Sequence, residues 1–290
     1  MNSLMTAGLL STDNATAPSR SILITGCSSG IGLASAQVMK ARGWRVLAAA
    51  RKTADMERLH AEVGVEPIPL ELTDDGSIAD CAEEALRRTD GKLTALFNNA
   101  AYGQVGAIED LSADVLRQQL EVNLIGTHEL TRRIIPAMRR NGGGRIVNCS
   151  SVLGLMAAPY RGAYSVSKFA LEALSDAMRI ELRGSGISVS LIEPGPIRTR
   201  FVETALETVK AIDMERSPHK AAYAARIAAM KAGGQQTFKL EPEAVTKRLI
   251  HALESRRPRA RYYVTTPAYA VAFLRRVLPQ AALDRLAAKA

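Results

Sequence analysis

Residues 21–32 read Ser-Ile-Leu-Ile-Thr-Gly-Cys-Ser-Ser-Gly-Ile-Gly, and this stretch decides the fold. The apolar residues 21–25 predict a short buried strand, and the glycines that follow predict a tight turn into a helix ending near Gly43. Glycines in such a turn let backbone N–H groups approach an anion closely, and the helix dipole favours negative charge there. The stretch therefore predicts a phosphate-binding turn, and a tight turn without a ligand is the alternative.

The alternation of strand and helix continues along the chain. Further strands are predicted at 45–50, 65–72, 93–98, 145–150, 187–192 and 261–264, with helices at 53–63, 77–88, 112–140 and 163–183. Most of these strands are apolar along their whole length, as in a parallel sheet buried between two layers of helices. The predicted fold class is α/β, with a single-domain, Rossmann-like, doubly wound sheet of about seven strands and helices on both faces.

The two ends of the chain and one internal stretch depart from this rhythm. Residues 1–19 have a short apolar patch without a preceding basic region and are interpreted as a flexible tail. After residue 192 the regular alternation is interrupted, and residues 197–240 form an insertion of the length that is usually functional. We expect a core domain over residues 20–265 that includes this insertion, and an amphipathic extension over 266–290.

Composition limits the class of protein and its compartment. With 290 residues, 47% hydrophobic and 23% charged, the chain is typical of a globular protein. The net charge of +9 favours anionic partners without choosing among phosphates, acidic lipids and nucleic acid. No apolar run is long enough for a transmembrane helix. Three scattered cysteines without histidines at ligand spacing predict neither disulfides nor a metal site, so a reducing cytoplasm is expected.

A second motif, Gly-Ala-Tyr-Ser-Val-Ser-Lys at 162–168, places a phenol and an amine four residues apart. On a helix, Tyr164 and Lys168 would share one face, about 6 Å apart along the axis. By itself this spacing is also typical of a surface helix. A phenol with its ordinary pKa near 10 is a poor base at neutral pH, and a nearby ammonium would lower that pKa.

Several motifs occur together in a fixed order. They are Thr25-Gly-x-x-x-Gly-x-Gly32, Asn98-Asn-Ala100, Asn123, Ser151, Tyr164-x-x-x-Lys168 and Pro194-Gly195. In order and separation they resemble the classical short-chain dehydrogenases/reductases, and most closely the 17β-hydroxysteroid and retinol dehydrogenase-like branch. The resemblance is strong over roughly residues 20 to 200 and weak beyond. It implies an enzyme that exchanges hydride between a nicotinamide and an alcohol or carbonyl compound.

The same resemblance assigns four catalytic residues. It implies that Tyr164 transfers the proton at the substrate oxygen and that Lys168 lowers the pKa of that phenol and holds the nicotinamide ribose. Ser151, rather than Ser150, has the spacing of the residue that hydrogen-bonds the substrate oxygen, although a strand-end turn would also favour serine. Asn123 is expected to connect Lys168 to a water-borne proton path.

The cofactor-binding residues implied by the resemblance lie mostly at strand ends. They are Gly26, Ser28, Ser29, Gly30, Ile31, Gly32, Arg51, Leu72, Asn98, Ala100, Tyr164, Lys168, Pro194, Gly195 and Thr199. Arg51 favours NADP(H), because an arginine suits the 2′-phosphate whereas relatives that prefer NAD usually carry an acid near this position. Ser29 would add a hydroxyl to the same phosphate, and a solvated Arg51 is the alternative. Glu71 stands where an aspartate often contacts adenine.

The predicted function is an NADP(H)-dependent oxidoreductase that interconverts a ketone or aldehyde and an alcohol. A bulky lipophilic substrate, such as a steroid, retinoid or acyl ketone, is expected because the insertion carries Phe201, Met214, Tyr223 and Met230 and is interpreted as a lid. A helix pair packed on the body is the other interpretation. The alternative function is a dinucleotide-sensing regulatory protein, which would not need the complete proton-donor set.

The expected partners are a small-molecule substrate and further copies of the chain, as a homodimer or homotetramer. Residues 256–276 carry six arginines and no acid around an apolar stretch. They are interpreted as a subunit contact, a solvated face or a peripheral contact with a membrane. Nucleic-acid binding is not expected, because few aromatic residues accompany these arginines.

Overall fold

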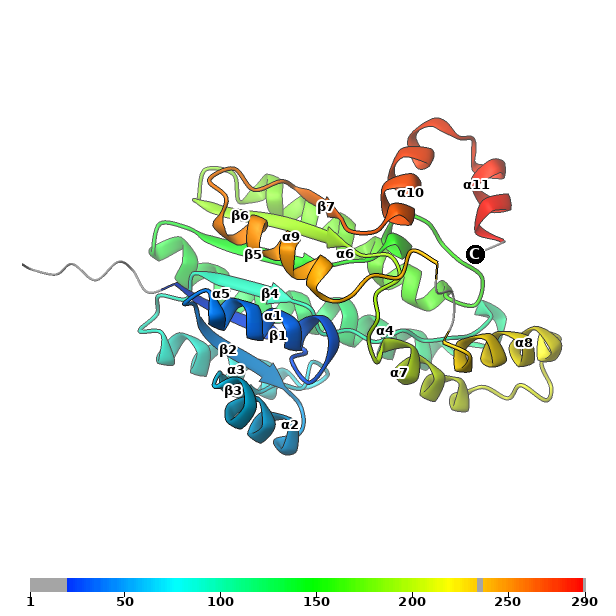
Figure 1. Cartoon of the computed structure of the whole chain (residues 1–290), viewed down its shortest axis with the longest axis horizontal. Coiled ribbons are helices and arrows are strands. Elements are labelled where there is room, and N and C mark those ends of the chain that lie inside the picture. The colour runs from blue at the N-terminus through cyan, green and yellow to red at the C-terminus, as the bar shows by residue number, and fades with distance from the viewer. Residues whose placement is uncertain (1–19, 234–236, 289–290) are drawn as a thin grey trace, which may run out of the picture.

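A seven-stranded parallel sheet forms the centre of the computed structural model, which describes residues 20–233 and 237–288 (Figure 1). The strand order is β3-β2-β1-β4-β5-β6-β7. The strands span Ser21–Thr25 (β1), Arg45–Ala50 (β2), Glu66–Pro69 (β3), Ala95–Asn98 (β4), Gly144–Cys149 (β5), Ile187–Glu193 (β6) and Arg261–Tyr263 (β7). The order changes direction between β1 and β4, where sheets of this type bind ligands at their carboxyl edge. The predicted α/β class is confirmed.

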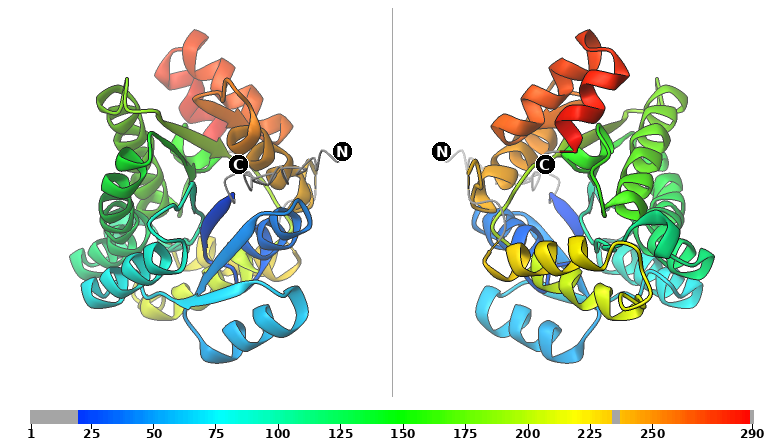
Figure 2. Two further views of the ribbon diagram at one scale, coloured as in Figure 1. Left: turned by 90° about the vertical axis from the view of Figure 1, so that its left-hand side faces the viewer. Right: turned by 90° about the vertical axis from the view of Figure 1, so that its right-hand side faces the viewer.

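Helices cover both faces of the sheet (Figure 2). One layer contains α1 (Gly30–Ala41), α2 (Thr53–Arg58) and α9 (Glu243–Glu254), and the other contains α3 (Asp75–Arg88), α5 (Gly126–Arg140) and α6 (Gly162–Glu181). In β1, Ile22 and Ile24 enter the core under the first layer, whereas Leu23 enters the core under the second. Successive strand side chains point to opposite faces, so burial on both faces requires the continuous apolar runs seen in the sequence.

The helix predicted over 112–140 is interrupted in the structure. It consists of α4 (Ala113–Leu120), a segment of wider π-helical turns at Glu121–Ile125, and α5. The side chain of Ser112 accepts a hydrogen bond from the N–H of Val115 and so caps the start of α4. π-helical turns often mark functional positions in helices. Asn123, one of the predicted catalytic residues, lies in this segment.

The predicted insertion contains two helices, α7 (Phe201–Thr208) and α8 (Lys220–Lys231), which lie beyond the carboxyl ends of the strands in Figure 1. They enclose a small apolar cluster with Val105, Ala205 and Val209 at its centre. The chain ends with α10 (Thr266–Val277) and α11 (Gln280–Ala287). Within residues 20–233 and 237–288, every helix is too short or too polar to cross a membrane.

Three predicted segments fall wholly or partly outside the described residues. These are the N-terminal tail at 1–19, residues 234–236 of the insertion, and residues 289–290 of the C-terminal extension. The third strand is shorter than expected, since β3 covers only Glu66–Pro69 instead of 65–72. Its prolines supply no N–H group to a ladder, which suits its place at the edge of the sheet.

Candidate active site

The predicted site residues gather at the carboxyl edge of the sheet. The glycine turn follows β1, Arg51 follows β2, Ala100 follows β4, Ser151 follows β5 and Pro194 follows β6. Because all the strands are parallel, these strand ends lie side by side. Residues that are far apart in the sequence therefore meet on one edge, as the motif order predicted.

The glycine turn is bonded to the end of β4. Thr25 Oγ1 accepts hydrogen bonds from the N–H groups of Asn99 and Ala100, both at 2.9 Å. Gly26 has φ of +72° and lies against Ala100, and a Cβ on Gly32 would overlap the carbonyl oxygen of Gly26. Only glycine allows this close packing. Thr25 and Asn99 were not among the predicted site residues, although both belong to the motifs that carried the resemblance.

The same turn fits the pyrophosphate of a dinucleotide. Ser29 precedes α1 and makes no side-chain capping bond, so its hydroxyl and the N–H groups of the first turn remain available to an anion. The backbone carbonyl of Ser28 accepts a hydrogen bond from Arg58 Nη2 at 2.6 Å, and Ile31 packs against the first core. A Cβ on Gly30 would press against the side chain of Thr199, which places the start of the insertion on this turn.

The end of β2 carries an ion pair that the sequence did not reveal. Arg51 Nη1 lies 3.3 Å from Glu71 Oε2, and the two side chains are 70% and 32% exposed. Glu71 Oε1 accepts hydrogen bonds from the N–H and the hydroxyl of Thr73. The carboxylate is therefore held in place and competes with any phosphate for the arginine.

Two of the predicted cofactor residues have side chains directed into the protein. Asn98 Nδ2 donates to Thr131 Oγ1 at 2.9 Å and to Asn148 Oδ1 at 2.8 Å, and so ties β4 to α5 and β5. Leu72 is buried in the second core. A cofactor contact at either position would use the backbone. Pro194 accepts a hydrogen bond from the N–H of Val152, and a Cβ on the next residue, Gly195, would overlap Thr265.

The predicted catalytic residues of α6 face the end of β5. Lys168 Nζ donates to the carbonyl oxygen of Cys149 at 2.8 Å and lies 5.7 Å from the centroid of the Tyr164 ring. Ser151 Oγ accepts a hydrogen bond from the N–H of Leu153 at 3.1 Å. This serine therefore also has the strand-end turn role that the sequence left as an alternative. The structure brings Ser151, Tyr164 and Lys168 together, and all three side chains are buried.

The electrostatics of the site differ from the expected ones. Burial raises the pKa of the Tyr164 phenol above its ordinary value, while its hydrogen bond with Ser151 and the charge of Arg161 act in the opposite direction. Burial also lowers the pKa of Lys168. This net direction is the opposite of the expected lowering, because burial outweighs the contributions that lower the pKa of the phenol.

Asn123 connects the substrate side of the sheet to α6. Its amide nitrogen donates to the carbonyl oxygen of Tyr102 at 2.9 Å and to Ser167 Oγ at 3.0 Å, and its amide oxygen accepts from the N–H of Tyr102. Ser167 in turn donates to the carbonyl oxygen of Tyr164. Asn123 therefore fixes the start of α6 relative to the loop after β4, and its hydrogen bonds run to Tyr102 and Ser167 instead of Lys168.

A group of buried charges lies one helical turn beyond Lys168. Arg261 Nη2 lies 3.0 Å from Glu172 Oε2 and 2.9 Å from Asp176 Oδ2, and Arg261 Nε lies 3.5 Å from Glu193 Oε1. Burial, together with the nearby charge of Glu172, raises the pKa of Glu193 to about 9. Arg261, one of the six arginines of residues 256–276, is therefore paired with acids of α6 and β6.

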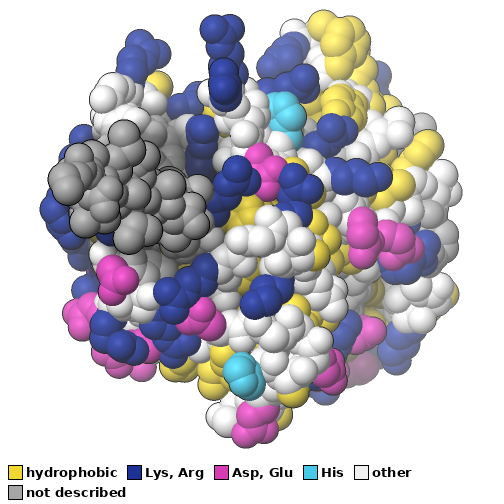
Figure 3. All heavy atoms as spheres, turned by 60° about the vertical axis from the view of Figure 1, so that its left-hand side comes forward, with side chains coloured by type: hydrophobic (Ala, Val, Ile, Leu, Met, Phe, Trp, Pro, Cys, Tyr) yellow, Lys and Arg dark blue, Asp and Glu magenta, His cyan; other side chains and the backbone are white. Residues whose placement is uncertain are grey.

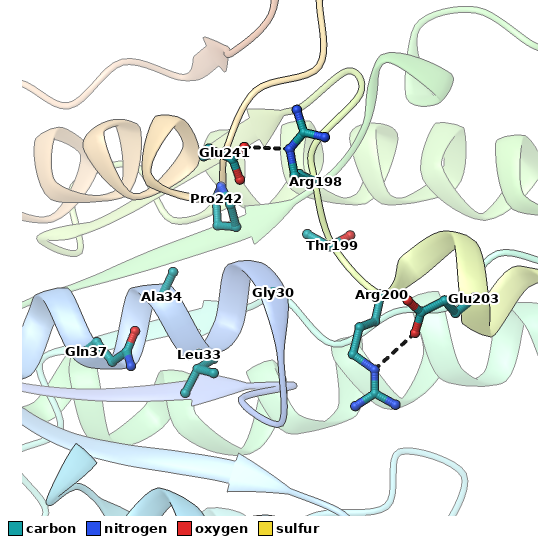
Figure 4. A pocket seen from close by; sticks show the side chains of 10 residues that line it. All are labelled: Gly30, Leu33, Ala34, Gln37, Arg198, Thr199, Arg200, Glu203, Glu241 and Pro242. Atoms are coloured by element: carbon teal, nitrogen blue, oxygen red, sulfur yellow. Dashed lines mark hydrogen bonds and ion pairs between the residues drawn. The ribbon is translucent and has the colours of Figure 1, made fainter. Parts of the chain in front are cut away.

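A hollow of about 460 Å³ borders the glycine turn on its other side (Figure 4). Ion pairs line it, between Arg198 and Glu241 at 2.6 Å and between Arg200 and Glu203 at 3.3 Å. Tyr164 is not among the lining residues. This hollow therefore adjoins the glycine turn and not Tyr164.

Comparisons with known proteins identify the family. A family model described as short chain dehydrogenase matches residues 20–210. The "Uncharacterized oxidoreductase YbbO" of Escherichia coli (strain K12) is 45% identical over 267 residues, which cover 92% of this chain and 93% of that protein. Homo sapiens 17-beta-hydroxysteroid dehydrogenase type 1 is 33% identical over 258 residues, with coverage of 84% and 77%. The chain belongs to the short-chain dehydrogenase/reductase family, whose members are oxidoreductases acting on CH–OH groups.

Solved structures agree with this assignment. A short-chain dehydrogenase from Burkholderia cenocepacia in complex with NADP is 25% identical, has a TM-score of 0.71, and covers 92% of this chain and 97% of its own. A Burkholderia phymatum homologue in complex with NAD has a TM-score of 0.77 at 24% identity, with coverage of 93% and 95%. Both cofactors therefore occur among proteins with this fold.

Proposed function

We propose that this oxidoreductase uses NADP(H) to interconvert a ketone or aldehyde and an alcohol on a lipophilic substrate. The observation that carries the proposal is the meeting of a buried Tyr164 hydroxyl with Ser151 and Lys168, beside a glycine turn that fits a dinucleotide. A protein that only senses a dinucleotide would not need a proton donor at this place. The enzymatic reading is therefore favoured over the regulatory one.

The residues of the site have distinct roles in carbonyl reduction. When NADP(H) is bound at the glycine turn, hydride for the carbonyl carbon would come from its nicotinamide. The Tyr164 hydroxyl donates its proton to the carbonyl oxygen, and the Ser151 hydroxyl stabilises the negative charge that develops there. Lys168 places a positive charge beside the phenol as it loses its proton. Asn123 acts as a positioning residue through Ser167, because its bonds fix the first turn of α6.

Arg51 supports NADP(H) as the cofactor. Its guanidinium stands at the end of β2, where the adenosine ribose of a dinucleotide lies in sheets of this type. Lys52 follows it and is also exposed, which adds a second positive charge near this strand end. The ion pair between Arg51 and Glu71 opposes this preference, and the balance between them sets the ratio of NADPH to NADH use.

The insertion supports a lipophilic substrate, and we propose that residues 197–240 act as a lid. The Phe201 ring of α7 lies 5.3 Å, centroid to centroid, from the ring of Tyr164. Gly103 faces the same phenylalanine, and a Cβ there would overlap its ring. Apolar side chains therefore border the proton donor, as a hydrophobic substrate requires. The likeness to a 17β-hydroxysteroid dehydrogenase adds support for this substrate class.

Further copies of the chain are the proposed macromolecular partners. Ile125, Val166 and Ile180 are 47%, 46% and 63% exposed on α6 and the segment before α5, which is typical of a subunit contact. On the face shown in Figure 3, lysines and arginines are interleaved with acids instead of forming one stripe, which argues against nucleic acid. All three cysteines are buried free thiols, which supports the proposed cytoplasmic location.

The test is a screen of NADPH and NADH consumption against carbonyl compounds from short aldehydes to steroid ketones. We expect NADPH-dependent reduction that improves with the apolar size of the substrate and is lost in Tyr164→Phe. Reduction of small polar carbonyls alone would contradict the lipophilic lid. Full activity in Tyr164→Phe would remove this residue from the mechanism.

A further inference from the structure

Arg161 stands at the wall of the active site, three residues before Tyr164. It precedes α6, and a separation of three residues on a helix is about 4.5 Å along the axis. Its charge acts on the Tyr164 phenol, and its Nη2 donates to the Met230 sulfur of α8 at 3.6 Å. The guanidinium therefore lies between the proton donor and the lid.

This arginine has no counter-charge. Its Nη1 is buried without a hydrogen-bond partner, and within the described residues Arg161 forms no ion pair. Burial lowers its pKa, and the nearby charge of Arg226 lowers it further. Arg226 belongs to α8, and its Cζ lies 4.5 Å from the centroid of the Tyr160 ring. The lid thus adds a second cation where an acid would be expected.

Arg261, whose side chain is 24% exposed, shows how the same chain pairs a partly buried arginine outside the candidate site. Three acidic side chains lie around Arg261, at distances of 2.9, 3.0 and 3.5 Å, so each side of its guanidinium has a polar partner. A buried guanidinium without such partners is costly, because its hydration is lost and nothing replaces it. The presence of the unpaired Arg161 next to Tyr164 therefore indicates that a ligand supplies the missing negative charge.

The backbone holds Arg161 in place. Tyr160 adopts φ of +62°, a left-handed conformation that is strained for a tyrosine, and its carbonyl oxygen accepts from the N–H of Gly106 at 3.0 Å. Its hydroxyl is hydrogen-bonded to His219 Nδ1 at 3.0 Å, which ties this turn to the start of α8. The guanidinium is therefore preorganised by three separate segments before any substrate binds.

We propose that Arg161 binds a carboxylate of the substrate, so that the enzyme acts on carbonyl compounds, or their alcohols, that also carry a carboxylate. The free Nη1 can donate to one carboxylate oxygen while Nη2 exchanges its weak sulfur contact for the other, which is the paired geometry that arginine forms with carboxylates. Phe201 and Met230 would line the apolar chain between the two groups. The inference rests on the proposed oxidoreductase function and narrows its substrate class.

The test compares straight-chain oxo acids with their uncharged methyl amides, over a series of chain lengths, in wild type and Arg161→Met. We expect kcat/KM for the preferred acid to fall roughly 10- to 100-fold in the variant, and kcat/KM for the amide to change less than about 3-fold. Arg216→Met is the matched control, because this arginine is 90% exposed and paired only with Asp213 at 3.7 Å. Removing an uncompensated buried charge should leave Tm unchanged or raise it.

Two results overturn the inference. If acid and amide lose activity equally, Arg161 acts only on the pKa of Tyr164, and the basic limb of the pH profile will shift with both substrates. If the wild-type enzyme has a higher kcat/KM for the amide than for the acid, Arg161 does not bind a substrate carboxylate. Arg161→Lys, which keeps the charge but not the paired geometry, replaces Arg161→Met if the latter fails to fold.

A readout without turnover separates this inference from the proposed function. Calorimetry measures binding of the matching straight-chain carboxylate, which has no carbonyl group, to the protein with NADP⁺. Binding that is at least about 10-fold weaker in Arg161→Met supports the carboxylate site even if no carbonyl in the screen is reduced. Equal binding in both proteins rejects the site even if the enzyme is an active reductase.

Discussion

Replacing Arg51 or Glu71 should change the choice between NADPH and NADH in opposite directions. Glu71→Gln removes a carboxylate that lies 3.3 Å from Arg51 Nη1 but can keep the acceptor for Thr73. Arg51→Ala removes the cation that the 2′-phosphate would contact. The first change should favour NADPH, and the second should disfavour it.

The magnitudes follow from exposure and bond type. With side chains 70% and 32% exposed, the pair contributes about 0–1 kcal/mol, so its loss in Glu71→Gln should raise the NADPH to NADH ratio of kcat/KM by up to about 5-fold. Loss of charge-assisted bonds to the 2′-phosphate costs about 1.5–3 kcal/mol. Arg51→Ala should therefore lower kcat/KM for NADPH roughly 10- to 100-fold, with little effect on NADH.

The assay is steady-state kinetics with one carbonyl substrate and either cofactor, at two ionic strengths. Added salt should shrink the Arg51→Ala effect, because screening weakens contacts between exposed charges. Arg256→Ala is the control, because it follows Glu254, which bonds Trp44 at the amino end of β2, whereas Arg51 follows the carboxyl end. The reasoning is refuted if Arg51→Ala lowers kcat/KM for both cofactors to the same extent, because the arginine would then not read the 2′-phosphate.

Three further predictions concern the proton donor, the buried acids and the glycine turn. Tyr164→Phe should lower kcat at least about 100-fold while the Kd for NADPH, measured by fluorescence, stays within about 3-fold. The pKa of Glu193 is raised to about 9, so its contribution to stability is complete below the ordinary carboxyl pKa and is lost as pH rises through about 9. Tm of Glu193→Gln should therefore fall less than wild-type Tm between pH 5 and 9. Parallel curves of Tm against pH for the two proteins would contradict this. Gly32→Ala should abolish NADPH binding and destabilise the fold by at least about 1–3 kcal/mol in denaturant titration. The control is Gly43→Ala, whose added Cβ meets open space. This variant should lose only about 1 kcal/mol of stability and bind NADPH normally.

The predictions that held rest on local patterns. The apolar run before the glycines predicted β1, and the four-residue spacing of Tyr164 and Lys168 predicted two neighbours on α6. Such patterns depend on periods of two or 3.6 residues, which can be counted without a partner. The helix at 112–140 shows the limit, because its π-helical segment is stabilised by bonds from Asn123 to the distant residues Tyr102 and Ser167.

The sequence alone predicted the parallel sheet, the glycine turn after β1 and the neighbouring placement of Tyr164 and Lys168, because each depends on residues that are close together or in a recurrent order. Only the tertiary structure decided which charges are paired. Arg261 is surrounded by acids from α6 and β6, whereas Arg161 meets a sulfur and a second arginine. It also decided that burial raises the pKa of Tyr164. Desolvation and charge pairing depend on which segments pack around a group, and those segments are remote in the chain.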